Sequence, residues 1–239
     1  MLRLAALTLA LPVALALPGA RTYPACSQTA AASELALLPD PTARVTIDPE
    51  APNALGDALR EVAASAGVHL LISDDVRATL AKGSELLESP VELAPETAWL
   101  FLETILIENE LLMVLNRRAG PRLVTIASRE PGRTFKLSPL WIEEEELHLA
   151  EQHPALHVST LVEAPHLDTF KLVSDLRFLM QGDWIIQRIL PAGDSRSIVL
   201  TGLGGDVGKF AKLIAEMDAA EAKRIATQDR DGRGARGGE

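Results

Sequence analysis

The spacing of hydrophobic residues predicts a first run of strands and helices over residues 44–128. Val45 and Ile47 alternate with polar residues as in a strand, and Gly67 is placed to end the first helix. Two further strands, a second helix and a closing hairpin follow, which gives the order β-α-β-β-α-β-β. The apolar positions at helical spacing are Leu55, Leu59, Val62 and Ala66 in the first helix, and Ala98, Phe101, Leu102, Ile105 and Leu106 in the second.

A second run, over residues 156–219, predicts the shorter order β-α-β-β-α. Its middle is a hairpin that turns between Pro191 and Ser195. The first helix is expected to bury Leu167, Phe170, Val173 or Leu172, Leu176 and Leu179, and the last to bury Val207, Phe210, Ile214 and Met217. The fold class is therefore α+β, with two small α/β sandwich domains in tandem.

The segments around these two regions have different compositions. Residues 27–43 are rich in Ala, Ser, Thr and Pro, and predict a flexible linker. Residues 129–155 form a linker with a short helix, which holds the acidic run Glu143 to Glu146 and ends before Pro154. Residues 220–239 contain few apolar side chains and several glycines, and we expect a disordered tail.

The N-terminus has the pattern of an export signal. Arg3 precedes an apolar run from Leu4 to Leu17, which is too short to span a bilayer and suits a signal-peptide core. Residues 1–26 are thus interpreted as a signal peptide and leader, and the expected location is the periplasm. Cys26 is the only cysteine, so it is either a lipidated N-terminus at the outer membrane or a lone thiol.

Net charge and composition limit the kind of partner and the kind of core that we expect. The 239 residues carry a formal net charge of −10, which disfavours nucleic acid as a partner. Hydrophobic residues make up 47% of the chain, enough for real cores, but only 4% are aromatic, so Leu, Ile, Val and Ala must fill them.

A glycine-rich segment, "GLGGDVGK", follows a predicted strand and precedes the last helix, as a phosphate-binding loop would. Leu203 and Phe210 stand where a Walker loop needs glycine and a hydroxyl side chain, and Val207 stands where a dinucleotide loop needs its third glycine. The segment is therefore interpreted as structural, with its glycines allowing a sharp turn and Asp206 capping the helix.

Other candidate chemistry is weaker still. His148, His153, His157 and His166 lie near four glutamates, but their spacing matches no zinc motif and we expect a surface cluster. The pair Asp74 and Asp75 is expected in a solvated turn, while Trp141 and Trp184 are either partner anchors or core residues. We predict no catalytic residue, metal site or cofactor.

Two stretches resemble a known family. "RVTIDPEAPNALGDALREVAASAGVHLLISDDV", with "SPVELAPETAWLFLETILIENELLMVL" and "RLVTIAS", resembles the first periplasmic domain of bacterial secretins, which also occurs at the N-terminus of some TonB-dependent receptors. "STLVEAPHLDTFKLVSDLRFLM" with "SRSIVLTGLGGDVGKFAKLIAEMD" resembles the NolW-like, ring-building secretin domain, a KH-like fold.

The resemblance implies a non-catalytic module for protein–protein interaction in the periplasm. Its expected partners are a secretin or inner-membrane components of a type II secretion or type IV pilus-like machine, or further copies of the chain, and no small-molecule substrate is expected. The second function that the resemblance implies is an STN-type signalling domain that engages an inner-membrane regulator. The sequence contains no predicted pore barrel, so we do not expect it to form the secretin pore itself.

Overall fold

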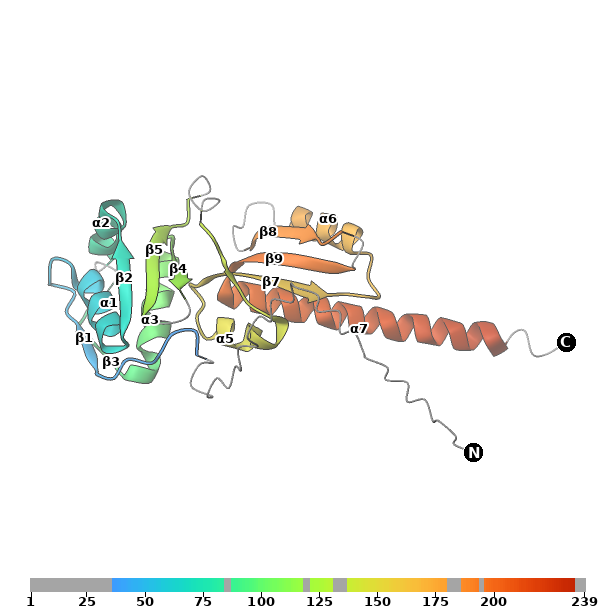
Figure 1. The fold of residues 1–239 in the computed structure, drawn as a ribbon, viewed down its shortest axis with the longest axis horizontal. Coiled ribbons are helices and arrows are strands. Elements are labelled where there is room, and N and C mark those ends of the chain that lie inside the picture. The colour runs from blue at the N-terminus through green and yellow to red at the C-terminus, as the bar shows by residue number, and fades with distance from the viewer. Residues whose placement is uncertain are drawn as a thin grey trace, which may run out of the picture. The chain divides into compact units, whose positions relative to one another are not determined.

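The computed structural model describes residues 36–83, 87–117, 121–130, 137–179, 186–193 and 196–234. The predicted leader, with Cys26, lies outside these ranges. Residues 34–239 form one compact unit, whose elements belong to the α+β class as predicted. Figure 1 shows a part rich in α1–α3 and a part built around α6 and α7.

The first part contains two small sheets with helices between their strands. The predicted order β-α-β-β-α-β-β was wrong at one point, because it lacked the helix α2 between β2 and β3. β1 and β3 pair antiparallel, while the other sheet has the order β2-β5-β4, with β2 parallel to β5 and β4 antiparallel to it. The elements are β1 (Val45–Ile47), α1 (Ala54–Ser65), β2 (Val68–Ile72), α2 (Asp74–Gly83), β3 (Val91–Leu93), α3 (Pro95–Glu108), β4 (Leu111–Arg117) and β5 (Arg122–Ser128).

The second part is a four-stranded sheet with the order β6-β7-β9-β8. The predicted order β-α-β-β-α appears in β7, α6, β8, β9 and α7. The elements are β6 (Leu140–Trp141), η3 (Glu144–Glu146), α5 (Leu147–Glu151), β7 (His157–Glu163), α6 (Thr169–Leu179), β8 (Ile186–Pro191), β9 (Ser197–Leu203) and α7 (Gly204–Gly234).

Local sequence explains why the first helices form where they do. The predicted face of α1 is buried, and Gly67 follows this helix at a φ of +67°, a backbone conformation that glycine adopts without strain. Asp74 and Asp75 are not in a turn, as the sequence suggested. They open α2, where two carboxylates in the first turn interact favourably with the helix dipole.

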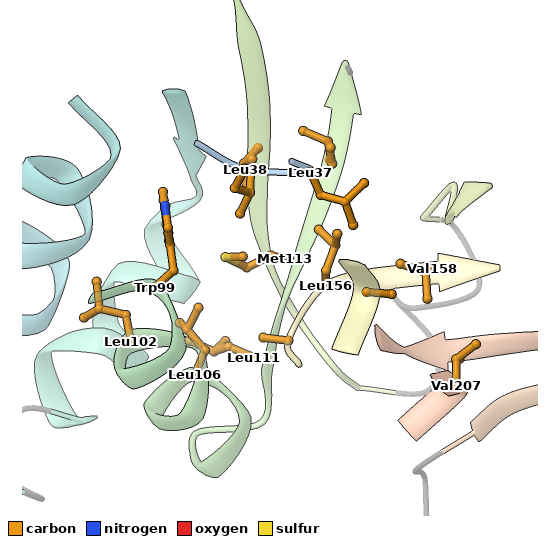
Figure 2. Packing of buried hydrophobic residues seen from close by; sticks show 14 of the residues in the cluster. Leu37, Leu38, Trp99, Leu102, Leu106, Leu111, Met113, Leu156, Val158 and Val207 are labelled. Carbon is orange, nitrogen blue, oxygen red and sulfur yellow. The ribbon is translucent and has the colours of Figure 1, made fainter. Parts of the chain in front are cut away.

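Part of the predicted linker at residues 27–43 is packed rather than flexible. Leu37 and Leu38 are almost fully buried, because they fill the core beside α3 and β4 (Figure 2). The indole N–H of Trp99 donates a hydrogen bond of 2.8 Å to the carbonyl oxygen of Pro39. Residues 36–43 therefore belong to the folded unit, and residues 27–35 lie outside the described part.

The linker predicted at residues 129–155 also contributes to the core. Its acidic helix is present as η3 and α5, and it ends before Pro154 as expected. The backbone N–H of Met113 in β4 donates to the carbonyl oxygen of Ala155 at 2.8 Å, and Leu156 forms a parallel bridge with Met113. Leu102 of α3 and Val207 of α7 thus belong to the same cluster of buried side chains (Figure 2).

The end of the chain differs from the prediction. α7 does not stop near Asp218 but goes on to Gly234 through most of the segment expected to be disordered. Val207 and Ile214 are buried as predicted, whereas Phe210 is only partly buried and Met217 is 37% exposed. Among the described residues, no helix combines the length and the apolar character needed to cross a membrane.

Candidate docking surface

The glycine-rich segment between β9 and α7 packs closely against the segment that contains α5. A β-carbon at Gly204 would lie 2.6 Å from the carbonyl oxygen of Ala150 and 2.7 Å from that of His153. The Gly204 N–H is already bonded, since it donates to the carbonyl oxygen of Leu156 at 2.7 Å. These glycines allow close helix packing, and the first turn of α7 has no room there for a phosphate.

The lysine of this segment points away from any such site. Lys209 has a 78% exposed side chain, and its Nζ lies 3.8 Å from a carboxylate oxygen of Asp206 in the same helix. Asp206 belongs to the first turn of α7 rather than preceding the helix as a cap. An exposed lysine that pairs with a carboxylate of its own helix agrees with a structural role for the segment rather than with phosphate binding.

The four neighbouring histidines do not form one cluster. His153 is buried and its Nδ1 lies 2.8 Å from Glu103, whereas His166 is half-exposed and pairs with Asp218 at 2.8 Å. His157 is buried in β7, and His148 is on the surface, beside the Glu145 carbonyl oxygen. The predicted surface cluster is therefore wrong. Within the described ranges, no three His, Cys, Asp or Glu side chains are grouped to hold a metal ion.

Large apolar side chains are exposed on α6 and on the neighbouring strand β8. Phe170 is 61% exposed and Phe178 is 73% exposed, although phenylalanine is rarely left in water. Leu190 in β8 is 42% exposed. A shallow hollow runs between the two elements, lined by Phe170, Val173, Ser174, Arg177, Phe178 and Pro191. These residues and Leu190 are called the α6–β8 surface below.

Helical geometry explains why the aromatic rings face outward. Leu172, Val173 and Leu176 turn one face of α6 toward the sheet and are all buried. At 100° per residue, Phe170 and Phe178 fall well outside that face. The prediction that Phe170 is inward was wrong, because residues 172 and 173 are both inside and shift the centre of the buried face away from it.

The outer edge of β8 is closed to strand pairing at two points. The guanidinium of Arg177 donates two hydrogen bonds, of 3.2 Å from Nε and 2.8 Å from Nη2, to the carbonyl oxygen of Ile189. Pro191 at the strand end has no N–H to offer. A partner on this surface would therefore contact side chains rather than extend the sheet.

The chemistry of the α6–β8 surface is that of a protein-binding site. Exposed aromatic rings and an arginine at one hollow are the residue types enriched where interfaces concentrate their binding energy. Of the residues considered from the sequence, Phe170 belongs to this surface, although it was expected in the core. Trp141, the other aromatic candidate, is 48% exposed and its indole N–H donates to Glu143, while Trp184 lies outside the described residues.

Comparison with known proteins gives little further guidance. No protein family matches the sequence, and no curated protein matches it significantly. Among solved structures, the chain is similar to the GspC-GspD complex from the type II secretion system of enterotoxigenic Escherichia coli. The identity is 11%, the match covers 74% of this chain and 99% of that chain, and the TM-score is 0.24. A TM-score this low carries no argument about function.

Proposed function

We propose that this protein is a non-catalytic interaction module of the bacterial cell envelope, which binds a protein partner through the α6–β8 surface. The observation that carries the proposal is the exposure of Phe170 and Phe178 around one hollow. Water contact with two such rings is unfavourable, at about 25 cal/mol per Å² of apolar area, so a partner that covers them gains binding energy. Arg177 lines the same hollow and is already held by the carbonyl oxygen of Ile189, so its side chain loses less conformational entropy on binding.

The partner we propose is a component of a secretin-type machine, as in type II secretion or type IV pilus assembly. The support is the resemblance of the two sequence regions to the N-terminal and ring-building domains of secretins, together with the predicted export signal. The location would be the periplasm, and the role would be accessory or in assembly. Neither part of this proposal requires a cofactor or a bound substrate.

A photo-crosslinking experiment tests the proposal. Benzoylphenylalanine is placed at Phe178 in one variant and, as a matched control, at Met217 on α7 in another; both side chains are exposed. We expect crosslinks from position 178 in living cells to a secretin or an inner-membrane assembly protein, identified by mass spectrometry. Position 217 should give few crosslinks to the same protein.

Substitution gives a second, independent readout. Phe170→Ser with Phe178→Ser should remove the crosslink partner from co-purification without lowering the free energy of unfolding, because both rings are exposed. Leu213→Ser with Met217→Ser is the control pair on α7. Equal co-purification with both double variants, or crosslinks only to cytosolic enzymes, would show that the proposal is wrong.

A further inference from the structure

A second surface, in the other part of the molecule, has different chemistry. β2 is the outermost strand of the sheet β2-β5-β4, so only one of its edges is paired with another described strand. The opposite edge of the same sheet is covered, because β4 contacts Ala155 and Leu156. Open edges of this kind can pair with an added strand.

A hollow follows the open edge of β2. It is lined by Val68, Leu70 and Ile72, and also by His69, whose side chain is on the opposite face of the sheet. A hollow bordered by both faces of one strand lies along the edge of that strand. No residue of β5, the strand on the paired side, contributes to the lining.

The walls of this hollow combine small and basic side chains. Ala64 of α1 is short and exposed, so it leaves room beside the strand, while its neighbour Ala63 is buried. Arg60 of α1 and Arg77 of α2 stand at the hollow, and no carboxylate is among its lining residues in the described part of the chain. The lining of this hollow is therefore basic, although the whole protein has a net charge of −10.

Each of the two arginines forms a surface ion pair that a ligand carboxylate can replace. Arg60 contacts Asp57 at 2.5 Å and Arg77 contacts Asp74 at 3.4 Å, each three residues back on its own helix. The carboxylates are 65% and 98% exposed, and such surface pairs contribute at most about 1 kcal/mol. A ligand carboxylate that also gains backbone hydrogen bonds from β2 can therefore compete with them.

We infer that the edge of β2 binds an extended protein segment in which apolar residues alternate with acidic ones. Such a segment adds a strand to β2. Side chains on one face of the new strand then lie over Ala64, where apolar groups fit. Carboxylates in the segment meet Arg60 and Arg77. This surface is separate from the α6–β8 surface, and the inference does not depend on the function proposed for that surface.

The probe for this inference is a capped nine-residue peptide in which Val alternates with Glu, titrated into the ¹⁵N-labelled protein. We expect chemical-shift changes at the amides of residues 68–72 and slower hydrogen exchange along that strand. A peptide with Lys in place of Glu should bind at least about tenfold more weakly. The Glu peptide with methylated backbone nitrogens should lose binding, because it cannot pair with the strand.

Charge reversal tests the role of the arginines. Arg60→Glu with Arg77→Glu should weaken binding of the Glu peptide and strengthen binding of the Lys peptide. The control pair Lys209→Glu with Lys223→Glu, on α7, should change the affinity for neither peptide. Equal binding of the two peptides, unchanged binding of the methylated peptide, or shifts confined to α6 and β8 would overturn the inference. Dimerisation that depends on concentration and is abolished by Arg60→Glu with Arg77→Glu would instead identify a second copy as the occupant, and would also overturn it.

Discussion

The carboxylate of Glu103 in α3 accepts two hydrogen bonds inside the core, at 2.8 Å from Nδ1 of His153 and at 2.9 Å from the N–H of Ala155. Glu103 is fully buried, and burial raises its pKa although both donors act in the opposite direction. Residues 50 positions apart in the sequence are thereby joined, and the segment after α5 is fixed against the first part of the protein.

Glu103→Ala is expected to lower the free energy of unfolding by about 3 kcal/mol, because it leaves two buried donors without an acceptor. Glu103→Gln should cost much less, within about 1 kcal/mol, since an amide oxygen can still accept from Ala155 and no charge is buried. Urea denaturation measures both. Glu108→Ala, at an exposed position of the same helix, should change stability by less than about 0.5 kcal/mol. Similar losses for Ala and Gln at position 103 would contradict this account.

Glu103 also shows what the sequence could not reveal. The apolar spacing of α1 and α3 predicted their buried faces, since helical periodicity is a local property. Glu103 is not one of these apolar positions, so in the sequence it is an ordinary polar residue of the helix. Its partner His153 lies in a segment interpreted as a linker. No local pattern indicates that two distant polar residues meet in a core.

The length of α7 and the buried face of α6 differ from the prediction for local reasons. The segment after Asp218 has no apolar stripe and was expected to be disordered, yet its Ala, Glu, Lys and Arg residues have high helix propensity and α7 supplies the preceding turns. Of the candidate docking surface, the helix α6 and the hairpin with β8 were predicted. The outward position of Phe170 was not, because the choice between Leu172 and Val173 as the buried residue was open and the structure buries both.

Gly204→Ala should destabilise the protein by about 1–3 kcal/mol, because the added methyl group meets backbone atoms of Ala150 and His153 that cannot move independently. The loss should appear although alanine generally favours helices by up to about 1 kcal/mol over glycine. Thermal or urea unfolding is the measurement.

Lys209→Ala is the matched control in the same segment, and it should change stability by less than about 0.5 kcal/mol, since its side chain is 78% exposed. Binding of ATP by the wild-type protein that disappears in Lys209→Ala would contradict the structural role of the glycines.

Asp218 of α7 gives the protein a pH-dependent contribution to stability. Its carboxylate accepts from the backbone N–H of His166 at 2.7 Å and from Nδ1 of His166 at 2.8 Å. Burial alone would raise its pKa, but these hydrogen bonds outweigh burial and lower the pKa below its ordinary value of 3.8. A lowered folded-state pKa stabilises the protein above the unfolded pKa, and that contribution is lost as the pH falls through the folded one.

Asp218→Asn is therefore expected to cost about 1–2 kcal/mol at pH 7 and progressively less as the pH falls below about 4. The measurement is urea denaturation of both proteins at a series of pH values, with Asp175→Asn at an exposed position of α6 as the control. A difference between wild type and Asp218→Asn that is the same at pH 7 and near pH 3 would show that the hydrogen bonds do not depend on the charge.

The far part of α7 should contribute helix but little stability. Side chains from Lys223 to Gln228 are exposed, and the only large apolar one among them is Ile225, at 38% exposure. A chain that ends at Ala222 should lose helical circular dichroism in proportion to residues 223–234. Its free energy of unfolding should stay within about 0.5 kcal/mol of the full chain, because no buried group is removed. Ile225→Ala in the full chain separates the loss of this one side chain from the loss of the helix. A truncated chain with unchanged circular dichroism would mean that this segment is not helical in solution, whereas a loss above about 2 kcal/mol would mean that it packs on the folded unit.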